Sequence, residues 1–357
     1  MAMVSNRISA KIANLSFLSS ILVCAIHGNF YPKVSAAGWW CEKLLQQGLS
    51  CAAVPFFFIV SGYMLARHFK EDDWWHKEIV KRIRTILVPL SIWLFIGFVA
   101  FMPLGIVADV VAGRPFGTNL AITPAKLAGF FGLDLSRMPG VGPLWYLRTL
   151  FLIVLLARPL KWLVCRFGAW WLATAYFLMV VGLSWREACG GNLGDNYLRG
   201  FYTYGLSVSG VFYMSAGMYL STHSALKRKI SGRGIAFCSS FVAIALLMVR
   251  GWWYRFEIPP LALSAFFVPC ILVALYHYVP DKCLPNVLSR ISFPLFVMHP
   301  IIGRYLGILF DMQKLVPNGC AKGVMVLLLT VLLSIGVAIS MRRFCPKFAY
   351  VAMGGRI

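Results

Sequence analysis

One histidine near the outer end of the first apolar segment is the side chain best suited to acid–base chemistry in this sequence. The segment reads IANLSFLSSILVCAIHGNF, and His27 is the one side chain in its apolar part of a type that ordinarily titrates near neutral pH. An imidazole inside lipid costs free energy unless it is paired or functional. His27 is therefore a candidate general base that removes a proton from a hydroxyl. An interfacial histidine bonded to a neighbouring carbonyl group would show the same pattern.

A second segment, VPFFFIVSGYMLARHF, supplies small and hydroxyl-bearing residues at adjacent positions. Gly62 allows another helix to approach closely, and Ser61 and Tyr63 can form hydrogen bonds across that contact. Together with His27, these residues suggest a polar pocket between two neighbouring helices, in which Ser61 and Tyr63 contact substrate. Ordinary helix packing explains each of them equally well.

Two further polar residues fall inside apolar segments. Arg148 lies in GPLWYLRTLFLIVLLARPL, and His299 lies in ISFPLFVMHPIIGRYL. If Arg148 faces the bundle, it can orient a sugar or stabilise an oxyanion; near the outer edge it would extend to water instead. Pro300 frees the carbonyl four residues back, which creates a polar irregularity beside His299. We expect both to contact substrate, although a structural histidine fits the pattern equally well.

Three cations, Lys81, Arg82 and Arg84, lie just before the apolar run TILVPLSIW. Guanidinium and ammonium groups bind phosphates, so Lys81 and Arg84 are candidates for holding a cytoplasmic cofactor. The alternative is that they only mark the cytoplasmic side of the membrane.

The elements that position these residues are membrane helices. The chain has 357 residues, of which 60% are hydrophobic and 13% are charged, whereas a soluble protein carries about a quarter charged residues. We predict an all-α polytopic membrane helix bundle with about ten transmembrane helices, forming a single domain over residues 1–357. The expected helices are residues 12–32, 48–66, 84–104, 143–160, 169–185, 200–220, 234–250, 260–279, 291–310 and 323–341.

The basic residues set the expected orientation. Of 34 Lys and Arg residues, 21 fall in segments that are cytoplasmic if the N-terminus is inside, and 11 fall in the opposite loops. This bias predicts two cytoplasmic termini, and it explains the net charge of +22 without a nucleic-acid partner. Within the 67–84 loop, Trp74 and Trp75 predict an interfacial helix. The long outer connection, about residues 105–142, is expected to cover an outer pocket.

No P-loop, GxGxxG, HExxH or metal-spaced Cys/His cluster occurs in the sequence, and the ten cysteines form no C-x-x-C pair. We therefore expect no metal site and no ATP-driven pump.

Five segments together resemble the bacterial integral-membrane acyltransferase 3 family. They are SILVCAIHGNF, VPFFFIVSGYML, HKEIVKRIRTILVPLSIW, GPLWYLRTLFLIVLLARPL and ISFPLFVMHPII, in the family's order. The resemblance implies ten membrane helices and transfer of an acyl group, commonly acetyl, from cytoplasmic acyl-CoA. Its acceptor would be a hydroxyl on a cell-surface or lipid-linked saccharide, and the enzyme would reside in the bacterial inner membrane. It implies no tightly bound cofactor.

The resemblance also assigns roles to individual residues. His27 falls at the family's helix-1 histidine, Lys81 and Arg84 at its paired basic positions for the donor, and Arg148 at an arginine found in one branch. One position departs from the family, which usually has Arg or Lys eleven residues before the histidine; here that residue is Ser16. Either Lys11 replaces the missing cation, or Lys81 and Arg84 suffice, or donor choice or activity is altered.

The sequence thus favours a membrane O-acyltransferase with His27 as its base, acting directly or through an acyl-histidine. A glycan or lipid transporter or flippase is the alternative, and it has no reason to bind acyl-CoA. An inactive partner in glycan export is a third possibility, raised by Ser16. The sequence does not determine the oligomeric state.

Overall fold

The computed structural model describes residues 2–27, 41–46, 48–115, 124, 128, 133–134, 141–188, 207–223, 232–253, 263–282, 286–313 and 319–356. Regular structure in these residues is helical, and they contain no strand. The predicted all-α helix bundle is therefore confirmed. The predicted helix ends at residues 28–32 and 200–206, and most of the outer connection, lie outside the described residues.

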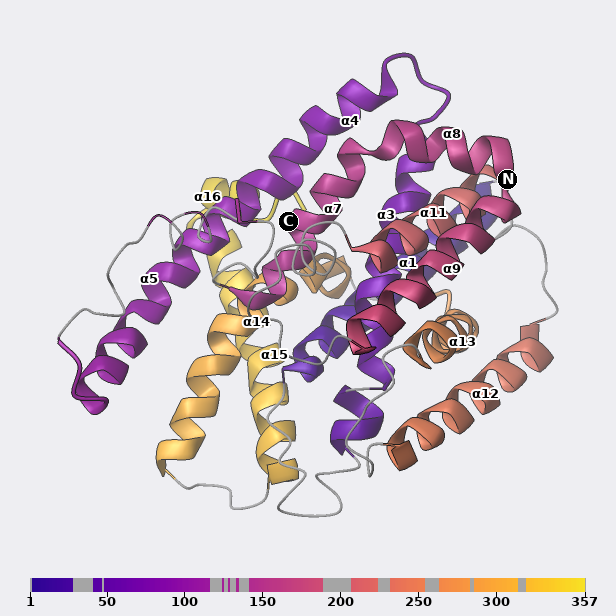
Figure 1. Ribbon diagram of the computed structural model, residues 1–357. Helices are drawn as coiled ribbons and strands as arrows, with labels where there is room; N and C mark the ends of the chain where they lie inside the picture. The colour runs from indigo at the N-terminus through magenta and orange to yellow at the C-terminus, as the bar shows by residue number, and fades with distance from the viewer. Residues whose placement is uncertain are drawn as a thin grey trace.

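Apolar helices form most of the bundle (Figure 1). Mostly apolar sequences, several of them near membrane-spanning length, give these helices. They are α1 (Ala2–Ile26), α3 (Ala53–Ala66), α5 (Val88–Val111), α7 (Trp145–Leu155), α9 (Ala169–Ala188), α11 (Val208–Thr222), α12 (Gly232–Trp253), α13 (Leu263–Tyr278), α14 (Asn286–Gln313) and α15 (Gly319–Phe344). Three further helices, α4 (Trp74–Arg82), α8 (Ala157–Phe167) and α16 (Pro346–Ala352), lie with both chain ends in the upper half of Figure 1.

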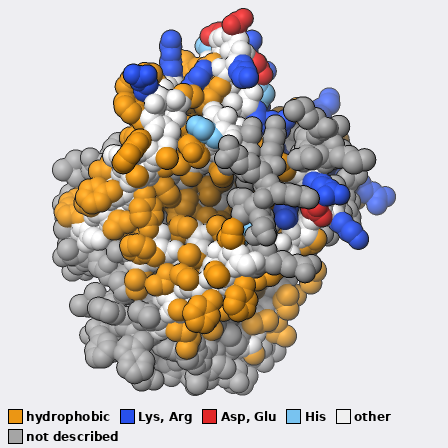
Figure 2. Space-filling view, turned by 90° about the vertical axis from the view of Figure 1, so that its right-hand side faces the viewer, with side chains coloured by type: hydrophobic (Ala, Val, Ile, Leu, Met, Phe, Trp, Pro, Cys, Tyr) orange, Lys and Arg blue, Asp and Glu red, His pale blue; other side chains and the backbone are white. Residues whose placement is uncertain are grey.

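Five helical segments are long and apolar enough to cross a membrane: Arg7–Ile26, Leu44–Ala66, Trp74–Val111, Arg290–Asp311 and Ala321–Phe344. Four shorter apolar helical segments, such as Leu263–Tyr278, accompany them. Figure 2 shows hydrophobic side chains across the middle of one face, with the charged side chains above it and to its right. This division is expected of a protein whose middle lies in lipid.

Several predicted boundaries were wrong, and α1 begins at Ala2 rather than near residue 12. The single helix expected over residues 143–160 breaks at Leu156, and α8 begins at Ala157. α8 is amphipathic, since Leu160 and Val164 are buried while Arg166 is exposed. It is therefore a separate helix with one apolar face, and not a continuation of the apolar helix α7. The outer connection is also shorter than predicted, because α5 continues to Val111.

A helix, α4, occupies the place of the interfacial helix expected in the 67–84 loop. Trp74 begins it and packs its ring against Phe69, with the centroids 4.8 Å apart. Lys161 of α8 donates a hydrogen bond to the Phe69 carbonyl at 2.7 Å. A π-helical turn, Ile83–Leu87, then joins α4 to α5. The four residues Lys81 to Arg84 therefore lie where α4 continues into α5, within the helical segment Trp74–Val111 (Figure 1).

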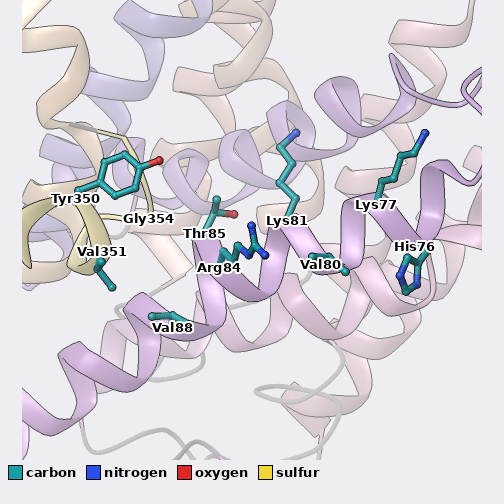
Figure 3. Close-up of a pocket in the computed structure, with 11 residues that line it drawn as sticks. His76, Lys77, Val80, Lys81, Arg84, Thr85, Val88, Tyr350, Val351 and Gly354 are labelled. Carbon is teal, nitrogen blue, oxygen red and sulfur yellow. The ribbon is translucent and has the colours of Figure 1, made fainter. Parts of the chain in front are cut away.

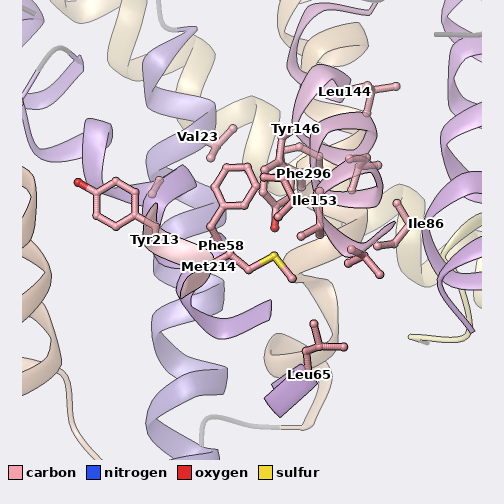
Figure 4. Packing of buried hydrophobic residues seen from close by; sticks show 14 of the residues in the cluster. Val23, Phe58, Leu65, Ile86, Leu144, Tyr146, Ile153, Tyr213, Met214 and Phe296 are labelled. Atoms are coloured by element: carbon pink, nitrogen blue, oxygen red, sulfur yellow. The ribbon is translucent and has the colours of Figure 1, made fainter. Parts of the chain in front are cut away.

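Close contact between α3 and α11 fixes the centre of the bundle. A Cβ atom on Gly217 would lie 2.8 Å from the Ile59 carbonyl carbon, and one on Gly62 would lie 2.9 Å from that of Met214. The role predicted for Gly62, close helix approach, is thus confirmed. Figure 4 shows the apolar cluster beside this contact, in which Phe58 and Met214 lie near Tyr146 of α7. This packing holds the Ser61 segment of α3 against the helices that line the site.

Candidate active site

His27 and His299 face each other although they lie on different helices. His27 follows the last turn of α1, and His299 lies in the middle of α14. Their ring centroids are 5.4 Å apart and the ring planes are inclined by 33°. His27 is exposed, whereas His299 is only 2% exposed. An exposed imidazole, that of His27, therefore lies directly beside a buried one, that of His299.

The two histidines line a cavity of about 230 Å³ between α1, α14 and α15, which we call the histidine cavity. Arg304, Asp311 and Thr330 add polar groups to its wall. Asp311 also pairs with Lys322 of α15, which ties the two helices together at one end. The cavity combines two possible proton acceptors with a cation and a hydroxyl, which suits a polar acceptor molecule.

Pro300 explains the orientation of His299. A proline has no N–H, so the carbonyl four residues earlier, that of Phe296, loses its helical partner. The Nδ1 atom of His299 lies 2.7 Å from that oxygen and 3.2 Å from the Leu295 carbonyl oxygen. Nδ1 therefore carries the proton, and Nε2 keeps its lone pair. Nε2 is buried and has no hydrogen-bond partner among the described residues.

A second cavity, of about 380 Å³, lies nearer the N-terminal half of α1, where Ala13 and Ser16 line it; we call it the arginine cavity. Five helices, α1, α3, α4, α7 and α14, and the C-terminal segment contribute to its lining. Its lining includes Ser16 of α1, Ser61 of α3, Tyr146 of α7 and Phe296 of α14. Phe296 lines this cavity, and its carbonyl oxygen is the one that lies 2.7 Å from Nδ1 of His299. The Phe296 end of the cavity is therefore close to the histidine pair.

Lys81 and Arg84 line a third space, a surface groove of about 790 Å³ (Figure 3). Lys77 of α4 and Tyr350 of α16 lie along the same groove. Both candidate donor-binding cations are exposed. The groove therefore presents several cations on the surface, which suits an anionic ligand.

Arg82, between the two donor-binding candidates, points inward instead. Its Nε donates to Glu78 at 2.7 Å, and its side chain is 12% exposed. Glu78 also accepts a hydrogen bond from Lys81 at 3.3 Å. Arg82 lines the arginine cavity with Arg290. The basic cluster is thus divided between an outer groove and an inner cavity.

Three candidates from the sequence lie away from these spaces. Arg148 is buried, and its Nη1 donates to the Asp134 carbonyl at 2.6 Å, which fixes a loop residue. Tyr63 lines none of the three spaces. Lys11, considered as a substitute for the missing helix-1 cation, places its Nζ 4.6 Å from the ring centre of Tyr276 and lines none of them either. The structure thus brings together His27 with His299, and Lys81 with Arg84.

Comparisons with known proteins fit this arrangement. The acyltransferase domain family matches residues 13–343, which is most of the chain. The chain belongs to this family. It is also 28% identical over 220 residues to the succinoglycan biosynthesis protein ExoH of Rhizobium meliloti (strain 1021), a match that covers 60% of this chain and 53% of that protein. The chain thus spans about half the length of this curated relative. No solved structure matches the chain.

Sequence reasoning did not select three cavity-lining arginines for the site, namely Arg304, Arg290 and Arg356. Gly303 and Gly307 follow His299 at intervals of four residues and line the histidine cavity with it, so this spacing was a usable signal for the helix face. Arg304 lies next to Gly303 and lines the same cavity. Arg290 and Arg356 had no such signal, because they reach the arginine cavity from segments remote in sequence from the basic cluster.

Proposed function

We propose that this protein is a membrane O-acyltransferase. It moves an acyl group, commonly acetyl, from cytoplasmic acyl-CoA to a hydroxyl of a cell-surface or lipid-linked saccharide. The observation that carries the proposal is the His27–His299 pair in a polar cavity of a chain from the acyltransferase domain family. Both termini are cytoplasmic in this proposal, and the protein resides in the inner membrane of a bacterium.

His27 is the general base of the proposed reaction. Its accessible imidazole takes the proton of the acceptor hydroxyl while the oxygen attacks the thioester carbonyl. The new C–O bond forms as the C–S bond breaks, and the proton passes to the departing CoA sulfur. The enclosed His299 contacts the acceptor through the lone pair of Nε2, which the Phe296 carbonyl holds in place through Nδ1.

Donor and acceptor approach from opposite sides in this proposal. Lys81 and Arg84 hold phosphates of the donor in the cytoplasmic groove. The thioester arm then reaches the histidines from the cytoplasmic side, past Ser61, which lines the arginine cavity. The acceptor enters the histidine cavity, and Arg148 and Tyr63 contribute to its binding only through the elements they stabilise.

Transfer measured with purified protein tests the proposal. Acyl-CoA with a labelled acyl group is incubated with a lipid-linked saccharide fraction, and acylated saccharide is detected by mass spectrometry. In cells, surface glycans made with and without the protein should differ by one acyl mass per modified sugar. Identical glycans and no labelled saccharide would contradict the proposal. If, in addition, the saccharide crosses the membrane only when the protein is present, the protein is a transporter instead.

A further inference from the structure

The three arginines in the arginine cavity form a cationic site without a carboxylate in its wall. Arg82, Arg290 and Arg356 come from α4, α14 and the C-terminal segment, and none of the described residues lining the cavity is acidic. Glu78 engages Arg82 from its Nε side. Three guanidinium groups around one space repel each other unless an anion lies between them.

Buried polar atoms aim into this space without partners. Nη1 of Arg356 and Oγ of Ser292 are both buried, and neither has a hydrogen-bond partner among the described residues. Burying such a group without a partner destabilises a protein, so unpartnered groups mark a place where a ligand is expected. Burial, and then the nearby Arg82, lower the pKa of Arg356 to about 10, so it stays charged at neutral pH. A guanidinium in this position binds phosphate groups with paired N–H donors.

The C-terminal segment is built to hold Arg356 there. The indole Nε1 of Trp93 donates to the Ala352 carbonyl at 3.0 Å in a buried contact. Gly354 follows with φ of 60°, and a Cβ atom on it would lie 3.0 Å from the Thr85 carbonyl carbon. Only glycine fits so close to another backbone with this φ. The Arg356 guanidinium then lies 4.1 Å from the ring centre of Phe293, a cation–π contact that fixes its direction.

The same segment separates the groove from the cavity. Gly354 and Gly355 line the surface groove beside Lys81 and Arg84, whereas Arg356 lines the arginine cavity. Arg356 lies beyond residues 13–343, the part of the chain that matches the acyltransferase domain family. Ser16 lines the cavity too, so cations from other elements surround the position where the helix-1 cation is missing.

We propose that the arginine cavity binds the diphosphate group of the acyl-CoA donor and that Arg356 of the C-terminal segment is one of its ligands. This inference rests on the proposed use of acyl-CoA. The aromatic walls formed by Phe57 and Phe296 then enclose the thioester arm on its way to the histidines. From Ser16 to His27 the distance along α1 is about 16 Å, at ~1.5 Å per residue, so an extended arm rather than the phosphates reaches the base.

Direct binding tests the site without any transfer step. Purified Arg356→Gln should bind coenzyme A about ten-fold to hundred-fold more weakly than the unmodified protein, since a charge-assisted phosphate contact is lost. Pantetheine, which has no phosphate, should bind both proteins equally. Inorganic pyrophosphate should compete with coenzyme A in the unmodified protein and lose that effect in the variant. Arg343→Gln is the matched control, because Arg343 is exposed on α15 and lines none of the three spaces.

A second variant guards against a folding defect. Arg290→Gln removes a cation that reaches the same cavity from α14, and it should weaken coenzyme A binding in the same phosphate-dependent way. Unchanged affinity in both variants, or tighter binding in Arg356→Gln, would overturn the site. If the unmodified protein binds coenzyme A but transfers no acyl group, the binding site stands and the proposed function fails. If both variants still transfer the acyl group with an unchanged donor KM, the proposed function stands and the binding site fails.

Discussion

The Nδ1 atom of His299 lies 2.7 Å from the carbonyl oxygen of Phe296, the oxygen that Pro300 leaves without a helical partner. The unpaired carbonyl of Phe296 thus orients the buried imidazole of His299, whose ring lies beside that of His27. The bond assigns the two ring nitrogens different tasks: Nδ1 satisfies the backbone, and Nε2 faces the cavity as an acceptor.

Amide substitutions at His299 separate these two tasks. His299→Asn places an amide near Nδ1 and keeps the bond to Phe296, whereas His299→Gln places its amide near Nε2. If Nε2 contacts the acceptor, Gln should retain more transfer activity than Asn and a lower acceptor KM, while Asn should retain more thermal stability. Steady-state kinetics and thermal unfolding in detergent measure both quantities. Higher activity in Asn than in Gln would mean that His299 is structural only.

Replacing His27 tests the base itself. His27→Ala should lower transfer by at least the roughly 10²–10⁴-fold that a general base contributes. The protein should stay folded, because His27 is exposed after the last turn of α1. His223→Ala is the control, since His223 is also exposed and stacks on Tyr219 away from the cavities. Near-normal transfer by His27→Ala would exclude the mechanism.

Neutralising the groove lined by Lys81 and Arg84 should affect the donor more than the acceptor. The double variant Lys81→Gln/Arg84→Gln should raise the donor KM more than the acceptor KM, because phosphate contacts are remote from the reacting carbon. Arg158→Gln/Arg166→Gln, on the exposed face of α8, is the matched control. Kinetics at several salt concentrations measure the effect. An unchanged donor KM returns Lys81 and Arg84 to a topological role.

Close packing between α3 and α11 gives a prediction on stability. A methyl group on Gly217 would lie 2.9 Å from the Tyr63 backbone nitrogen, so Gly217→Ala should destabilise the protein by about 1–3 kcal/mol through overpacking. Gly336→Ala is the control, since nothing lies within 4 Å of its added carbon, and it should be neutral or stabilising. Thermal unfolding in detergent compares the two. Equal stability would mean that the two helices separate readily, and that Ser61 is not held in a fixed position.

Sequence patterns predicted the helices because apolar runs near membrane length have one stable outcome in lipid. Sequence patterns missed the break at Leu156, because the residues just before the break are apolar. The change becomes visible only where the amphipathic pattern of α8 begins. Sequence patterns also identified the basic cluster, but not that Lys81 and Arg84 line the groove while Arg82 lines the arginine cavity. Which cation faces inward depends on Glu78 and on packing against the C-terminal segment. Contacts of that kind join residues far apart in the chain, and periodicity carries no information about them.

Ser16 provides the last prediction, because the cavity around it changes what an added cation does. Its hydroxyl donates to the Ile12 carbonyl at 2.7 Å, and it lines the arginine cavity with Arg82 and Arg356. Ser16→Arg should lower thermal stability in the absence of ligand, since a further guanidinium joins three that already lack a carboxylate in the cavity wall. Coenzyme A should then bind more tightly than it does to the unmodified protein.

Ser16→Gln is the matched control, because it adds similar length without charge. Thermal unfolding with and without coenzyme A reports both effects, since a ligand stabilises in proportion to the logarithm of its concentration over Kd. The arginine variant should therefore show the larger ligand-induced shift, and the glutamine variant should not. Weaker coenzyme A binding in Ser16→Arg at unchanged stability would contradict this. It would mean that the small side chain is an adapted feature of the cavity, and that Arg356 already occupies the space in which a helix-1 cation would act.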